Sequence, residues 1–220
     1  MGCVSAETVQ GRVEIVASKD AGVRKRDYSG VVVWLDPASG VFPPIVKPAK
    51  AIMQQRDKKF VPHVLAVTVG ARVAFPNEDP IFHNAFSNYD GQVFDVGLYP
   101  PGTSREVSFR KEGIVRIFCD IHPTMSAIIV VLRTPYYAVS AHDGAFSIAG
   151  VPPGSYRLHV FHERATEQTL KALERTVDVS GDVTLPNITV SESGYLVLPH
   201  KNKFGKDYRP DAGSYSGSKQ

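Results

Sequence analysis

The sequence predicts an all-β protein, and three observations support that prediction. Short runs rich in β-branched residues recur along the chain. Glycine and proline separate these runs at regular intervals, as turns separate the strands of β-sandwich and Greek-key folds. Only residues 166–173 have a helix-forming composition, and they span barely two turns, so this segment is predicted to be a connector.

The predicted strands are short and are bounded by turn residues. Taken in chain order, they are expected at residues 9–16, 30–35, 63–69, 71–75, 106–109, 113–118, 127–132, 145–148, 155–161 and 175–179. A length of 220 residues suits one large or two small domains.

Composition excludes several classes of function. With 43% apolar and 21% charged residues, the chain has the composition of an ordinary globular protein. Its net charge of +3 comes from 25 basic and 22 acidic residues without a dense basic run, so no nucleic-acid partner is expected. The longest apolar run, residues 127–132, is strand-sized, so no transmembrane segment is expected.

The N-terminal residues carry a hint of export. The small residues at positions 4–6 fit the pattern before a signal-peptidase cut, and Gly2-Cys3 fits the remnant of a lipoprotein cleavage site. Residues 1–8 are therefore expected to be an export-signal remnant or a disordered end, with Cys3 as a possible lipid anchor. Since the only other cysteine is Cys119, a disulfide framework is not expected.

One group of residues has side chains that can bind a metal ion. Cys119, His122 and Met125 form a Cys-x-x-His-x-x-Met motif, and His83 lies about 36 residues upstream. One thiolate, two imidazoles and one thioether are the ligand set of a mononuclear blue copper site, in which soft sulfur favours copper. The spacing therefore indicates a metal site suited to one-electron transfer.

The motif, with Pro123 directly after His122, resembles the ligand loop of amicyanin among the plastocyanin-type cupredoxins. The resemblance covers roughly residues 60–132 and includes two upstream segments, VTVGARVAFPN at 67–77 and PIFHN at 80–84. It implies a cupredoxin Greek-key β-sandwich at residues 49–133.

The cupredoxin resemblance also implies residue roles. His83, Cys119 and His122 would be the equatorial ligands and Met125 the axial ligand of one copper ion per chain, which would cycle between Cu(I) and Cu(II). His122 would be the port for electrons. Residues around the ligands would support the site: Asn84 would tie the first histidine to the cysteine loop, and an apolar collar would comprise Phe82, Phe118, Pro80 and Pro123.

The flanking segments resemble a second fold. Residues 11–13, 29–35, 138–148 and 151–158, with a Pro-Pro-Gly turn, are similar to the strands of a carboxypeptidase-regulatory-like, transthyretin-like β-sandwich. Residues 9–48 plus 134–198 would then form a discontinuous sandwich into which the cupredoxin domain is inserted or to which it is joined. Residues 199–220, rich in Gly, Ser and Lys, are predicted to be an extended tail.

Catalysis is not expected. No nucleophile elbow, phosphate loop or dinucleotide fingerprint occurs, and there is no His-x-His pair of the kind that multicopper oxidases need. The acidic pair Glu78-Asp79 is interpreted as a turn former. His159 and His162 would face opposite sides of a strand and would make a poor chelate.

The leading interpretation is an electron carrier. The resemblance implies a periplasmic or otherwise extracytoplasmic location and redox partners of the cytochrome or dehydrogenase type, and a lipid on Cys3 would add a membrane tether. Two alternatives stay open. The chain could bind and deliver copper, or it could be a structural or ligand-binding module whose site is vestigial or holds zinc in tetrahedral coordination.

Overall fold

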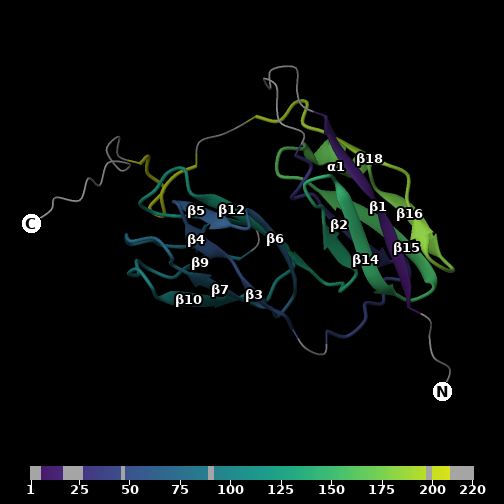
Figure 1. The fold of residues 1–220 in the computed structure, drawn as a ribbon, viewed down its shortest axis with the longest axis horizontal. Coiled ribbons are helices and arrows are strands. Elements are labelled where there is room, and N and C mark those ends of the chain that lie inside the picture. Colours follow the sequence, from purple (N-terminus) through teal and green to yellow (C-terminus); the bar gives the residue numbers. More distant parts are fainter. Residues whose placement is uncertain (1–5, 17–26, 46–47, 89–91, 197–199, 209–220) are drawn as a thin grey trace, which may run out of the picture. The chain divides into compact units, whose positions relative to one another are not determined.

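The protein is all-β, as predicted, in the part of the chain that the computed structural model describes (Figure 1), residues 6–16, 27–45, 48–88, 92–196 and 200–208. Within these ranges α1 (Glu167–Ala172) is the only helix, and no helix is long and apolar enough to cross a membrane. The expected anchor Cys3 lies outside the described residues.

The chain divides into two compact units. The first comprises Met1–Val46 and Arg133–Val197, and the second comprises Lys47–Leu132 and Leu198–Gln220. The first unit is therefore built from two pieces of chain that flank most of the second.

The first unit contains two sheets. One has the order β14-β1-β17, with β18 also paired to β1, and the other has the order β13-β2-β15-β16. The strands are β1 (Glu7–Val16), β2 (Val32–Pro37), β13 (Tyr137–Val139), β14 (Ala145–Val151), β15 (Gly154–Phe161), β16 (Arg175–Val179), β17 (Val183–Thr184) and β18 (Ile188–Ser191). Pairing across the two pieces holds the unit together, because β1 is antiparallel to β14 and β2 is antiparallel to β15.

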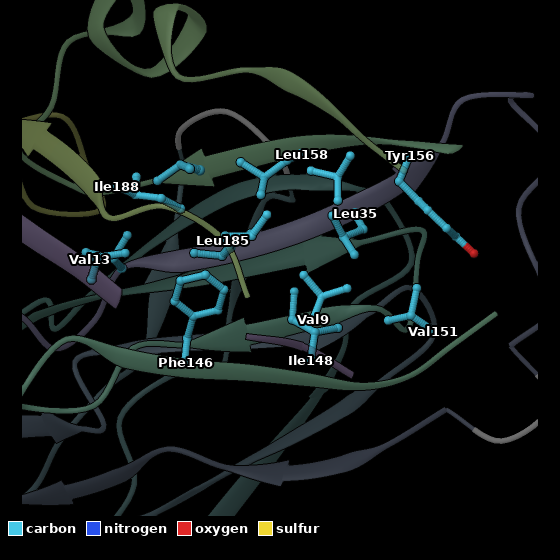
Figure 2. Packing of buried hydrophobic residues seen from close by; sticks show 14 of the residues in the cluster. Val9, Val13, Leu35, Phe146, Ile148, Val151, Tyr156, Leu158, Leu185 and Ile188 are labelled. Atoms are coloured by element: carbon cyan, nitrogen blue, oxygen red, sulfur yellow. The ribbon is translucent and has the colours of Figure 1, made fainter. Parts of the chain in front are cut away.

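The two sheets of the first unit enclose one apolar core. Figure 2 shows Val9 and Ile148 of one sheet with Leu35 and Leu158 of the other, and all four are at most 1% exposed. Burial of apolar side chains on the inner faces is the main source of stability in such a sandwich. The helix α1 begins after Thr166, whose side chain accepts a hydrogen bond from the Thr169 N–H.

The second unit contains a three-stranded sheet of order β10-β7-β3, a five-stranded sheet of order β6-β12-β11-β8-β9, and the hairpin β4-β5. The strands are β3 (Lys50–Ile52), β4 (Gln54–Arg56), β5 (Lys59–Val61), β6 (Val64–Thr68), β7 (Arg72–Pro76), β8 (Phe86–Ser87), β9 (Phe94–Asp95), β10 (Ser104–Ser108), β11 (Gly113–Phe118) and β12 (Ser126–Leu132).

The core of the second unit reaches the predicted metal site. Val73 and Phe75 of β7 pack in the same cluster as Ile117 of β11 and Ile129 of β12, and each is fully buried. Cys119 and Met125 belong to this cluster too. The ends of β11 and β12 thus position the cysteine loop, and the core beneath it restrains its side chains.

The described part of the C-terminal segment has no helix or strand. Residues 200–208, expected as part of an extended tail, nevertheless contact the main piece of the second unit through hydrogen bonds to Cys119, Asp120 and Pro123. The sequence offered no periodic pattern that indicates these contacts.

Candidate metal centre

The loop between β11 and β12 carries three of the four predicted ligands. Cys119 follows the last residue of β11, and Met125 precedes the first residue of β12. Two backbone hydrogen bonds close the loop, from Cys119 N to Met125 O at 3.2 Å and from Met125 N to His122 O at 3.0 Å. Because β11 and β12 pair without a register shift up to Phe118 and Ser126, the loop is held directly at its base.

The first histidine reaches the loop from another part of the sheet. His83 forms an isolated bridge with Tyr99, through backbone hydrogen bonds of 3.2 and 2.9 Å. Three residues later, Phe86 of β8 pairs with Phe118 of β11. This pairing places His83 beside Cys119 although 36 positions separate the two residues.

The donor atoms of His83, Cys119 and His122 converge. The two Nδ1 atoms are 3.1 Å apart, and Cys119 Sγ is 3.9 Å from His83 Nδ1 and 3.6 Å from His122 Nδ1. Donors that share one ion at bond lengths near 2.0 Å for nitrogen and 2.3 Å for sulfur lie about 3.3 to 3.8 Å apart. The triangle therefore fits a single transition-metal ion, and among the described residues these three form a group able to hold one.

The site is enclosed. His83 and Cys119 are 0% exposed, His122 is 6% exposed, and Met125 is also fully buried. An imidazole pair with a thiolate and a nearby thioether is a soft donor set, which favours copper. The small exposed part of the site thus belongs to His122, the residue expected to be the port for electrons.

Burial sets the protonation of the donors in the metal-free protein. It lowers the pKa of His83, and it lowers the pKa of His122 to about 4, with help from neighbouring His83. Burial raises the pKa of the Cys119 thiol, although the backbone N–H groups of Ile121 and Asn84 oppose that effect. At neutral pH both imidazoles are therefore neutral and can donate a lone pair, whereas the thiol must lose a proton to bind a metal.

Asn84 connects three parts of the site. Its backbone N–H donates a hydrogen bond to the Cys119 sulfur, and its side-chain oxygen accepts a hydrogen bond from Asp120 N at 3.3 Å. Its side-chain nitrogen donates to Asp95 of β9 at 2.7 Å. These contacts tie the segment of the first histidine to the cysteine loop.

The four apolar residues of the expected collar differ in exposure. Phe118 is buried and stacks against the ring of His200 at 4.1 Å between centroids. Pro80 and Pro123 are exposed, and Phe82 is 54% exposed. The C-terminal segment covers part of this region, since His200 Nε2 lies 2.7 Å from the Pro123 carbonyl oxygen.

Asp79 is a site residue that the sequence interpretation missed. Its Oδ2 lies 2.7 Å from His83 Nε2, on the side of the ring away from Cys119. Burial alone would raise the pKa of Asp79, but hydrogen bonds from Lys58 N, His83 and Asp57 N outweigh it and hold the pKa below its usual value. Its position four residues before His83 was the available signal.

A buried polar network supports the same region. The Tyr99 hydroxyl lies 2.6 Å from Gln55 Oε1, and Gln55 Nε2 donates to the Asn84 carbonyl at 3.0 Å. Burial raises the pKa of Tyr99, so the phenol stays protonated and can donate. Nothing in the spacing of these residues indicates that they meet.

The other histidines do not assemble a second centre among the described residues. His159 lies between Asp36 and Glu174 and stacks on Trp34, whereas His162 pairs with buried Glu192. The two histidines thus use different partners. His63 lies 3.0 Å from the Ser126 carbonyl oxygen through Nδ1.

Comparison with solved structures returns a cupredoxin, several amicyanin variants and a copper-containing nitrite reductase. A purple cupredoxin from Nitrosopumilus maritimus is 24% identical, with 37% of this chain and 99% of that chain covered and a TM-score of 0.34. A reduced amicyanin variant is 19% identical, with 40% and 95% covered and a TM-score of 0.36. A copper-containing nitrite reductase from Thermus scotoductus is 28% identical, with 44% and 27% covered and a TM-score of 0.37.

Among curated proteins, the methylamine utilization protein MauL of Methylorubrum extorquens is 37% identical over 60 residues. The match covers 27% of this chain and 53% of that protein, so the chain spans about half the length of this relative. No family model matches the chain.

Proposed function

We propose that this protein is a type 1 copper protein that carries single electrons between redox partner proteins outside the cytoplasm. The observation that carries the proposal is the convergence of His83, Cys119 and His122, whose donor atoms all lie within 4.8 Å of one another in a buried setting. Bound copper would supply one-electron chemistry by alternating between Cu(I) and Cu(II).

The residues of the chain would hold the ion in a fixed frame. His83, Cys119 and His122 would be the main ligands, and Met125 at the base of β12 would be the fourth. The β11-β12 ladder holds the cysteine loop, and Asn84 links it to the first histidine. Donors restrained in this way rearrange little when the charge of the ion changes, which favours rapid electron transfer.

The enclosure of the site favours a carrier over a delivery protein. The four proposed ligands are buried, so a chelator in solution has little access to them. We expect the protein to retain Cu(I) in the presence of a Cu(I) chelator for hours. Loss within seconds would favour copper delivery.

The setting of the function is also proposed. The amicyanin resemblance supports an extracytoplasmic location, with Cys3 as a possible lipid anchor, and partners of the cytochrome or dehydrogenase type. The similarity to a methylamine utilization protein supports a role in the use of a small amine. The first unit is proposed to be a transthyretin-like sandwich that serves as a spacer or docking platform.

A copper titration tests the proposal. Metal-free protein is titrated with Cu(II) while the visible spectrum is recorded, and a mild reductant and then an oxidant are added. We expect an intense thiolate-to-copper(II) band that saturates at one copper per chain, bleaches on reduction and returns on oxidation. A parallel titration with Zn²⁺ serves as the colourless control. Absence of the band would contradict the proposal, and tight binding of zinc alone would point to a structural site.

A further inference from the structure

Asp79 joins a hairpin turn to the first histidine. Its Oδ1 accepts a hydrogen bond from Asp57 N at 2.7 Å, and its Oδ2 accepts one from Lys58 N at 2.9 Å. The same Oδ2 lies 2.7 Å from His83 Nε2. The carboxylate is almost completely buried, with 9% of its side chain exposed.

The turn is shaped to hold a carboxylate. Asp57 and Lys58 connect β4 to β5, and both have a positive φ of 54°. Two successive left-handed residues form the tight turn of a two-residue hairpin. Here both backbone N–H groups point at the same carboxylate, in the manner of an anion-binding nest. Asp79 is therefore fixed from one side by the backbone and meets His83 on the other.

The contact decides which nitrogen of His83 carries the proton. An ionised carboxylate can only accept hydrogen bonds. Nε2 of His83 must therefore donate to Asp79, which leaves Nδ1 of the neutral ring unprotonated. That Nδ1 is the atom that lies 3.1 Å from His122 Nδ1 and 3.9 Å from Cys119 Sγ.

We propose that Asp79 is a positioning residue that selects the metal-binding tautomer of His83 and, by its negative charge, favours the oxidised state of the centre. This inference rests on the proposed copper function. A carboxylate bonded to a ligating histidine orients the ring and makes it a stronger base. A nearby negative charge also stabilises the ion of higher charge more than the ion of lower charge.

Two variants separate this role from a general effect of surface charge. D79N removes the charge that contacts His83, whereas D57N removes the same charge from a neighbouring side chain that is 84% exposed. D57N keeps the backbone N–H that binds Asp79, and asparagine tolerates a positive φ. The measurements are the reduction potential and competition titrations with Cu(II) and Cu(I).

For D79N we expect the affinity for Cu(II), relative to Cu(I), to fall about 10- to 100-fold. This raises the reduction potential by about 60 to 120 mV, because a tenfold change corresponds to 59 mV for one electron. For D57N we expect the affinity for Cu(II) relative to Cu(I) to change by less than about threefold, since solvent screens an exposed charge. Equal shifts in the two variants would overturn the inference.

The unsubstituted protein provides a second test that needs neither copper nor a stable variant. Nitrogen-15 NMR of the metal-free protein, labelled at histidine, reports the protonation of each ring nitrogen. We expect His83 to be protonated at Nε2 and unprotonated at Nδ1, and the opposite tautomer would overturn the inference even if D79N failed to fold. If no copper band formed, the proposed function would fail, while this spectrum would still decide the role of Asp79.

Discussion

The Tyr208 hydroxyl lies 2.8 Å from the backbone carbonyl oxygen of Cys119 and donates a hydrogen bond to it, although 89 positions separate the two residues. The same hydroxyl is 3.3 Å from His200 Nδ1, and the His200 ring stacks on Phe118. Lys203 adds an ion pair with Asp95 at 2.9 Å. Residues 200–208 therefore form a strap across the loop that carries the proposed ligands.

Replacing Tyr208 with phenylalanine should loosen this strap. A hydrogen bond of this kind contributes about 1 kcal/mol, so the open state of the segment should become about fivefold more populated. Limited trypsin digestion measures this as faster cleavage after Lys203, with cleavage sites in the first unit as the internal control. An unchanged rate at Lys203 would show that the hydroxyl does not hold the strap.

Replacing Cys119 with serine should abolish the thiolate-to-copper(II) band, because a hydroxyl is not a soft thiolate donor. The fold should persist, since the side chain changes little in size. The visible spectrum and the far-ultraviolet circular dichroism are recorded together. Cys3→Ser is the matched control and should keep the full band, whereas colour that survives in C119S would refute the assignment of Cys119 as a ligand.

Replacing Met125 with glutamine should preserve the colour and shift the reduction potential. The weak axial ligand of such sites tunes the potential, while the colour comes from the thiolate. Redox titration of both proteins measures the shift. An identical potential would remove Met125 from the proposed ligand set and leave it as a buried core residue.

Replacing Tyr99 with phenylalanine should destabilise the second unit by about 1 to 3 kcal/mol, because the buried Gln55 Oε1 would lose its donor. Urea unfolding checks this as a lower midpoint with an unchanged slope. Tyr195→Phe, at a partly exposed position of the first unit, should stay within about 0.5 kcal/mol of the parent protein. Similar values for the two variants would argue against the network.

The pH dependence of the unfolding free energy should show how much the ion pairs of His159 stabilise the first unit. Burial lowers its pKa, but Asp36 and Glu174 outweigh burial and raise the pKa above the usual value of 6.5. Its stabilisation is therefore complete below about pH 6.5 and is lost as the pH rises through the pKa of the folded state.

Unfolding free energies of the parent protein and H159Q, measured between pH 5.5 and 8.5, isolate this contribution. The difference between the two proteins should shrink as the pH rises. His142→Gln, at an exposed histidine of the same unit, is measured alongside as the matched histidine variant. A constant difference for H159Q would contradict the assigned ion pairs.

Local patterns predicted the all-β class and the ranges of the longer strands, because β-branched runs between turn residues are visible in the sequence. The proximity of Cys119 and His122 was anticipated because both lie in one short loop, whereas His83 was assigned to the same site through the resemblance to cupredoxins. Strands such as β8 and β9 are two residues long and carry no periodic signal. Asp79 was interpreted only as a turn former. Its hydrogen-bond donors are the backbone N–H groups of Asp57 and Lys58. Because almost every residue type supplies such a group, the sequence does not indicate the contact.

The division of the chain between the two units has a consequence for protein synthesis. Strands β1 and β2 are made early, but their partners β14 and β15 follow only after the whole of residues 47–132. Thr8, for example, bonds to Asp182, which lies 174 positions further along. Contacts so distant in sequence close slowly, whereas the strands of the second unit are complete once β12 has been made.

We therefore expect the donor triangle to form before residues 133–197, the second piece of the first unit, are available to pair with β1 and β2. Residues 200–208 are made last among the described residues, so the strap can bind only after the cysteine loop has been made. The order of the chain thus leaves an interval in which the cysteine loop is built and still uncovered, and in that interval a metal ion has its easiest access.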